Sequence, residues 1–147
     1  MMEKQKNDTT ELLKECNAGS KMAVDAIDQI LPMTRSDDLR RLLRDNKEKH
    51  TELGEKIHSE LSRSGSREED PPAAAKTMAH VTTSVKMMLK PDDHEVANII
   101  TDGCNMGIKS LHEYLNQYQA AAPEARKLTG ELADLEASLM EDLQQYL

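Results

Sequence analysis

The spacing of the apolar residues constrains the fold of this chain more than any other feature. In two long segments, apolar side chains recur every three or four positions and so fall on one face of an α-helix. The face in the second predicted helix, which includes one polar pair, consists of Leu39, Leu43, Asn46, His50, Leu53, Ile57 and Leu61. The face in the last predicted helix consists of Leu128, Leu132, Leu135, Leu139, Leu143 and Tyr146. Amphipathic helices of this length bury such faces against one another in a shared core.

The prolines all lie between periodic segments, where the missing backbone N–H does not interrupt a helix. β-branched residues are few and no segment alternates with a period of two, so no strand is expected. Residues 1–7 are predicted to be disordered, and residues 8–147 to form a single domain. Within that domain the pattern predicts helices over residues 8–31, 36–62, 72–89, 92–120 and 123–146.

Typical helix-start residues support these boundaries. Asp8 lies three residues before a glutamate, which is the spacing of a capping box, and Asp92 does the same. Ser36, followed by two aspartates, is placed as an N-cap, and Pro123 as the first residue of the last helix. Each of these residues is therefore expected at a helix N-terminus.

Long amphipathic helices joined by short links form a four-helix bundle most economically. The polar stretch 62–70 and the short helix at 72–89 do not fit a short link. We therefore expect an all-α four-helix bundle in which residues 62–92 form a crossover that runs the length of the bundle and carries a short helix.

Charge and composition exclude several classes of protein. The formal net charge is −8, and aromatic residues make up 2% of the chain, so both the basic surface and the stacking platforms of a nucleic-acid-binding protein are lacking. No apolar run approaches the roughly 20 residues that a membrane span needs. The first residues have no apolar signal core, so a cytoplasmic location is expected.

The two halves of the chain resemble each other at an offset of 88 residues. Cys16-Asn17-Ala18-Gly19-Ser20-Lys21 matches Cys104-Asn105-Met106-Gly107-Ile108-Lys109 at Cys, Asn, Gly and Lys. A duplicated helix hairpin explains this match, and chance is the alternative. If the hairpin is duplicated, a pseudo-twofold axis brings the first and fourth predicted helices together near Gly19 and Gly107, where small residues permit a close approach.

A duplicated helix hairpin with a long crossover resembles the ferritin-like superfamily, in particular its small bacterial bundles of unknown function. The resemblance implies a bacterial source. Members that oxidise iron carry an inward Glu on the first helix of each hairpin and Glu-x-x-His on the second. Here Glu55-x-x-His58 is the only Glu-x-x-His, and it lies off the apolar face. We expect no carboxylate on the core faces of the first and fourth predicted helices, and a core face of leucines without His in the last. A di-iron centre is therefore not expected.

Few residues are candidates for chemistry. His50 lies on a core face, either as a residual metal ligand or as a hydrogen-bonded core histidine, and Glu55 and His58 are the remaining metal candidates. Cys16 and Cys104 are expected to be reduced, buried thiols, with a redox pair as the alternative.

These observations predict a function without a reaction centre. We expect a non-enzymatic structural or protein-interaction module, with no catalytic or cofactor-binding residue. The alternative is a metal-binding ferritin-like oxidase or iron-handling stress protein that uses iron or manganese. A homodimer is a further prediction, because the helix at 72–89 has an apolar stripe that covers either its own bundle or a partner subunit. That stripe consists of Met78, Val81, Val85, Met88 and Leu89.

Overall fold

The computed structural model describes residues 2–65, 71–88 and 90–147, all of them helical or in connections. No strand occurs within those ranges, which confirms the prediction of an all-α fold. The helices are α1 (Met2–Ile30), α2 (Asp37–Arg63), α3 (Pro72–Lys86), α4 (Asp93–Gln117) and α5 (Pro123–Leu143). Two 3₁₀ turns, Leu31–Met33 and Gln144–Tyr146, follow α1 and α5.

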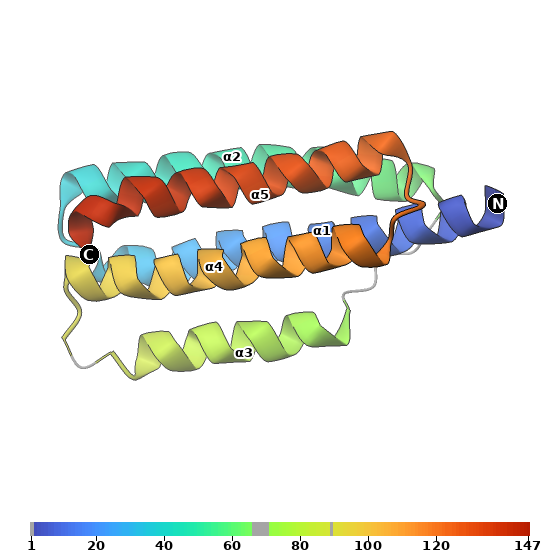
Figure 1. Ribbon diagram of the computed structural model, residues 1–147. Coiled ribbons are helices and arrows are strands. Elements are labelled where there is room, and N and C mark those ends of the chain that lie inside the picture. The colour runs from blue at the N-terminus through green and yellow to red at the C-terminus, as the bar shows by residue number, and fades with distance from the viewer. Residues whose placement is uncertain (1, 66–70, 89) are drawn as a thin grey trace.

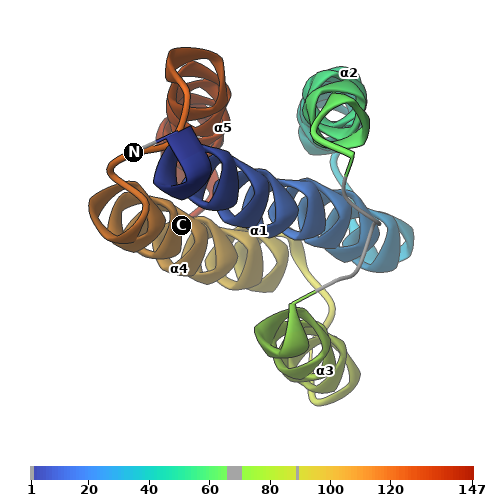
Figure 2. The same ribbon diagram turned by 90° about the vertical axis from the view of Figure 1, so that its right-hand side faces the viewer.

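The helices form a bundle of two antiparallel hairpins with α3 on the outside (Figure 1). One hairpin is α1 with α2 and the other is α4 with α5, while α3 runs back along the bundle so that α2 and α4 point the same way (Figure 1). Viewed towards the helix ends, α1 lies between α2, α4 and α3 (Figure 2). It contacts each of the other four helices. The shorter helix predicted between residues 62 and 92 is thus present as α3, which packs on α1 and α4.

Most of the predicted helix starts are confirmed. The Ser36 hydroxyl accepts a hydrogen bond from the Leu39 amide at 3.2 Å, and the Asp92 carboxylate accepts one from the Glu95 amide at 2.9 Å. Pro123 is the first residue of α5. These caps satisfy backbone donors that have no partner inside their helices.

The predicted capping box at Asp8 is wrong, because α1 already begins at Met2 and continues through Asp8. Residues 2–7 contain no proline or glycine that would interrupt the helix. The Asp8 carboxylate instead accepts a hydrogen bond from the Ala120 amide at 3.0 Å, and the Thr9 hydroxyl accepts one from the Ala122 amide at 2.7 Å. Both side chains therefore hold the connection between α4 and α5.

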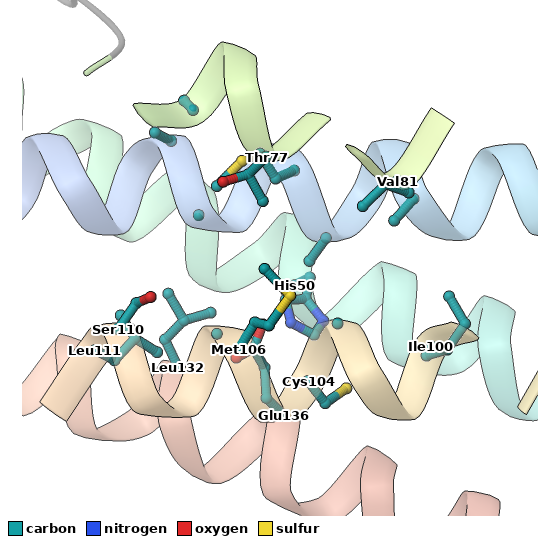
Figure 3. A pocket seen from close by; sticks show the side chains of 18 of the residues that line it. His50, Thr77, Val81, Ile100, Cys104, Met106, Ser110, Leu111, Leu132 and Glu136 are labelled. Atoms are coloured by element: carbon teal, nitrogen blue, oxygen red, sulfur yellow. The ribbon is translucent and has the colours of Figure 1, made fainter. Parts of the chain in front are cut away.

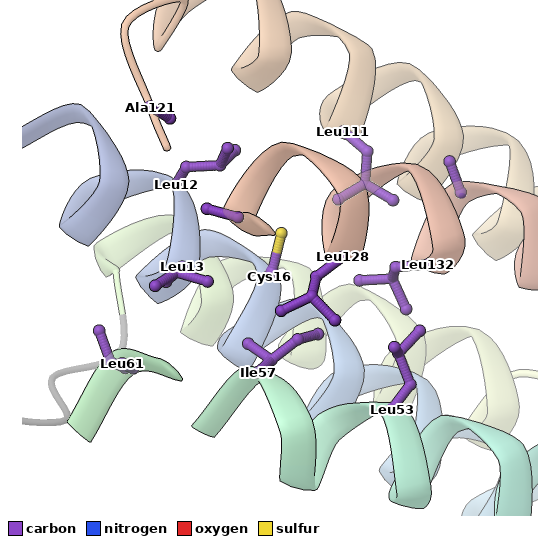
Figure 4. Packing of buried hydrophobic residues seen from close by; sticks show 12 residues of the cluster. Leu12, Leu13, Cys16, Leu53, Ile57, Leu61, Leu111, Ala121, Leu128 and Leu132 are labelled. Atoms are coloured by element: carbon purple, nitrogen blue, oxygen red, sulfur yellow. The ribbon is translucent and has the colours of Figure 1, made fainter. Parts of the chain in front are cut away.

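The buried apolar residues form two clusters, one towards each end of the bundle. The first cluster, shown in Figure 4 and called the proximal core, consists of Leu12, Leu13, Cys16, Leu53, Ile57, Leu61, Leu111, Ala121, Ala125, Leu128, Leu132 and Ala133. The second, called the distal core, consists of Ile27, Ile30, Leu39, Leu43, Val85, Val96, Ala97, Ile100, Cys104, Leu139 and Leu143. The predicted face of α2 is confirmed at every position.

The buried face of α5 differs from the prediction at one helical turn. Leu135 is only partly buried, whereas Glu136 is buried between Leu132 and Leu139. The expectation of a core face made of leucines is therefore wrong at this turn. Spacings of four and then three residues connect these three positions, so Glu136 lies on the centre of the buried face.

The apolar stripe of α3 covers the protein's own bundle. Val85 is buried in the distal core, and Val81 and Met88 pack against it. Met78 is half-buried, and Leu89 lies outside the described residues. This accounts for the apolar character of α3 without a partner subunit.

Candidate functional site

A cavity of about 150 Å³ lies between the two cores and is lined by residues from all five helices. Figure 3 shows the side chains around it. α1 and α4 form much of its wall, α2 and α5 each contribute a titratable side chain, and Thr77 and Val81 of α3 line its outer side. The cavity is therefore a place where all five helices meet.

Small residues on α1 and α4 explain why the cavity is here. Gly19 and Ala23 line it from α1, and Gly103 and Gly107 line it from α4. The helix positions that carry leucine or isoleucine in the two cores carry small residues in the middle, so the packed side chains leave a void.

The two repeat glycines face neighbouring turns of α5. A Cβ atom added at Gly19 would lie 3.9 Å from a methyl of Leu132, which is an ordinary contact. A Cβ atom at Gly107 would overlap the carboxyl group of Glu136, with one carboxyl oxygen only 2.8 Å away. Glycine at 107 therefore makes the space into which the Glu136 side chain extends.

The remaining repeat residues correspond only in part. Cys16 and Cys104 are both buried, but Asn17 is buried while Asn105 is exposed. The shared glycines and cysteines therefore occupy comparable inward positions in α1 and α4, and the asparagines do not.

His50 reaches the cavity from α2 and is 1% exposed. Its Nδ1 lies 3.1 Å from the backbone oxygen of Asn46, so we assign the proton to Nδ1 as the donor. Burial lowers the pKa of His50, and the ring is therefore neutral near pH 7. Its Nε2 is then an acceptor that has no hydrogen-bond partner among the described residues.

Glu136 reaches the cavity from α5 and is 9% exposed. Burial raises the pKa of its carboxyl group to about 8, so the group is mainly protonated near pH 7. Its Oε2 has no hydrogen-bond partner in the described part of the chain. The sequence reasoning missed this residue; the signal was its place four residues after Leu132 and three before Leu139.

A polar link joins α1 and α4 at the cavity wall. The Tyr114 hydroxyl is hydrogen-bonded to the Glu15 carboxylate, and both residues line the cavity. Burial raises the pKa of Glu15, while this hydrogen bond opposes the shift, and burial together with Glu15 raises the pKa of Tyr114 to about 12. Glu15 also corrects the expectation that the first predicted helix has no carboxylate towards the core.

The two cysteines are free, buried thiols, as predicted. The Cys16 sulfur lies 3.1 Å from the Thr129 hydroxyl, and burial raises its pKa to about 11. Cys104 lines the cavity, and burial together with the nearby Glu136 strongly raises its pKa. Neither sulfur is a thiolate near neutral pH, and neither has the reactivity of a nucleophile.

The metal candidates are not brought together. Glu55 and His58 are exposed on α2, whereas His50 is buried on the inner face of the same helix. Across residues 2–65, 71–88 and 90–147, no three His, Cys, Asp or Glu side chains gather closely enough to hold a metal ion. The cavity wall that contains Cys104 also carries His50, Glu136 and Glu15, which are side-chain types able to bind metals.

The composition of the cavity wall resembles that of small-molecule binding sites. A mostly apolar wall with a few polar groups is typical of small-molecule sites. Here the wall presents a neutral imidazole acceptor and a neutral carboxylic acid, both without partners among the residues that the structure describes.

Comparisons of the chain with protein-family models, with curated proteins and with solved structures find no significant match. None of the described helices is both long enough and apolar enough to cross a membrane.

Proposed function

We propose that this protein is a non-enzymatic binding module that holds a small, mainly apolar molecule inside its helical bundle. The observation that carries the proposal is the cavity of about 150 Å³ whose wall includes two buried, unpartnered polar groups, His50 and Glu136. A bundle selected only for stability would fill this space with leucine, because each buried polar group without a partner costs about 1–3 kcal/mol. The cost is understandable if a ligand fills the space.

Binding of toluene tests this proposal directly. An apolar cavity of about 150 Å³ accommodates benzene, so a slightly larger aromatic probe is a suitable first ligand. We expect saturable binding by calorimetry and a rise in melting temperature that grows with toluene concentration.

A matched pair of variants places the toluene in the cavity. Ala23 lines the cavity, and Ala23→Leu should fill it and abolish the binding. Ala137 is exposed on α5, and Ala137→Leu should leave the binding unchanged. Equal affinities of the two variants for toluene, or no binding to the unmodified protein, would contradict the proposal.

A ferritin-like relationship is part of the same proposal. Two antiparallel hairpins, a helix that returns the chain between them, and the repeat of Cys and Gly in α1 and α4 support it.

The alternative function, iron or manganese binding, is favoured by His50 and Glu136 in one cavity. Metal analysis of protein purified without chelator tests it, and stoichiometric iron or manganese would support the metal-binding function.

The predictions of a structural or protein-interaction role and of a homodimer stay predictions. Light scattering at micromolar concentration distinguishes a 16.5 kDa monomer from a dimer. Val81 and Val85 of α3 contact the protein's own core, so these two side chains are not free to form a dimer interface.

A further inference from the structure

We propose that the cavity recognises an uncharged, compact aromatic molecule carrying a hydroxyl group, of the size and chemistry of phenol. This inference rests on the proposed binding function and adds to it the chemical class of the ligand. It follows from the two polar groups on the wall, from the charges around them and from the apolar remainder of the wall.

The polar groups are complementary to a hydroxyl group. Because the Nδ1–H of His50 is used by the Asn46 carbonyl, the Nε2 of His50 offers a lone pair to the cavity. The protonated carboxyl of Glu136 can donate its O–H and still accept at its other oxygen. A hydroxyl group both donates and accepts, so it can satisfy the imidazole and the carboxylic acid. Hydrocarbons would leave both groups without partners.

The surrounding charges disfavour an anion. Glu15 lines the cavity together with Glu136, and the formal net charge of the chain is −8. An anionic ligand would be repelled by the Glu15 carboxylate and by the negative net charge of the chain. A cation would have to leave water for a mostly apolar wall, where burial of its charge is unfavourable. An uncharged ligand avoids both penalties.

The remainder of the wall suits an aromatic ring. Met22 and Met106 line the cavity, and thioether sulfur makes favourable contacts with aromatic rings. Ile99, Ile100 and Leu132 supply further apolar surface. In size the cavity matches a single ring with one substituent.

Calorimetry with phenol, toluene and benzylamine tests the inference on the full chain at pH 6.5. Phenol can form a hydrogen bond with polar groups that toluene leaves without partners. Such a bond contributes about 1 kcal/mol to the binding free energy, so we expect phenol to bind about fivefold more tightly than toluene. Benzylamine, which is a cation at this pH, should bind more weakly than phenol.

Variants of the two polar residues identify the source of the preference. His50→Leu and Glu136→Met should each reduce the preference for phenol over toluene, because each removes one of the two recognition groups and leaves the other. Glu136→Gln keeps a neutral donor of similar shape and should retain the preference for phenol. Circular dichroism checks that each variant is folded.

A pH titration of the unmodified protein gives an independent readout that needs no variant. The titratable groups around the cavity are His50 from α2, Glu136 from α5, Cys104 and Tyr114 from α4, and Glu15 from α1. Loss of the Glu136 proton removes the donor, so the affinity for phenol should fall between pH 7 and 9. The affinity of Glu136→Gln for phenol should stay constant over the same range.

The outcomes separate the two proposals. Equal affinities of the unmodified protein for phenol and toluene, or tighter binding of benzylamine, would overturn the hydroxyl inference and leave the binding function intact. Failure of all three probes to bind would overturn the binding function itself. A phenol affinity that does not change between pH 7 and 9 would also overturn the role of Glu136.

Discussion

The two ends of the bundle and its middle use the same helices in different ways. At the ends, leucine and isoleucine from several helices fill the space between the backbones, as in the proximal core of Figure 4. In the middle, the same helical faces carry Gly19, Gly107, His50 and Glu136 around a cavity. One periodic pattern thus produces both a packed core and a void, because the period decides which residues face inward and residue size decides whether they fill the interior.

The middle also differs from the ends in polarity. On the cavity wall, His50 Nε2 and Glu136 Oε2 are buried without hydrogen-bond partners among the described residues. Since such groups lower the free energy of unfolding, the packed ends must stabilise the fold while the middle lowers its stability. The predictions that follow test this division of roles.

The largest expected effect comes from breaking the proximal core. Ile57 is fully buried, and Ile57→Ala should lower the free energy of unfolding by about 2–5 kcal/mol because it leaves a cavity in a packed region. Urea denaturation measures this change. Met22→Ala is the comparison in the middle, where the side chain already faces a void. A loss at Met22 as large as that at Ile57 would show that the middle is packed as tightly as the ends.

The next effect is the pH dependence that Glu136 confers on the free energy of unfolding. Its pKa is raised from 4.5 to about 8 by burial, so in this range the folded state holds a proton that the unfolded state releases. The free energy of unfolding should therefore fall as pH rises from about 5 to 8, by up to about 1.4 kcal/mol per pH unit, and level off above the folded pKa.

Glu136→Gln removes this titration while keeping the shape of the side chain. The difference between the unmodified protein and the variant isolates Glu136 from His50, whose pKa is lowered by burial and which therefore destabilises the fold at acidic pH instead. Urea denaturation at several pH values gives the comparison. Parallel pH profiles for the two proteins would mean that the Glu136 carboxyl is solvated in the folded state.

The smallest expected effect is a difference in stability between alanine substitutions at two glycines of α4. Alanine at an exposed helix position is better than glycine by about 0.5–1 kcal/mol, so Gly103→Ala, with open space around its Cβ in the described structure, should stabilise the fold by this amount. Gly107→Ala should not gain it, because the new methyl would overlap the Glu136 carboxyl.

Toluene affinity sharpens the same comparison. The methyl of Gly107→Ala should push the Glu136 side chain further into the cavity and so weaken toluene binding more than Gly103→Ala, whose methyl would meet no atom of the described structure within 4 Å. Thermal unfolding and calorimetry of the two variants measure both effects. Equal stabilisation by the two substitutions would show that Glu136 moves away freely.

Much of the architecture could be predicted from the sequence because it depends on local rules. The recurrence of Leu39, Leu43 and Leu53 at helical spacing predicts the inward face of α2, and the caps at Ser36 and Asp92 satisfy amides only three residues away. Proline is disfavoured inside a helix because its ring clashes with the preceding turn and it lacks a backbone N–H. None of these inferences requires knowledge of what the helix packs against.

The candidate site required the tertiary structure, because it depends on what distant residues place beside one another. Asp8 has the local spacing of a cap, yet its carboxylate bonds the Ala120 amide, since α1 passes beside the α4–α5 connection. Glu136 has the composition of a surface residue, and only the packing of α4 against α5, with Gly107 making room, decides that its carboxyl is buried. Charge state and cavity both depend on the surrounding atoms, so the sequence determined the helices and their inward faces, whereas the tertiary structure decided where the interior stays open and polar.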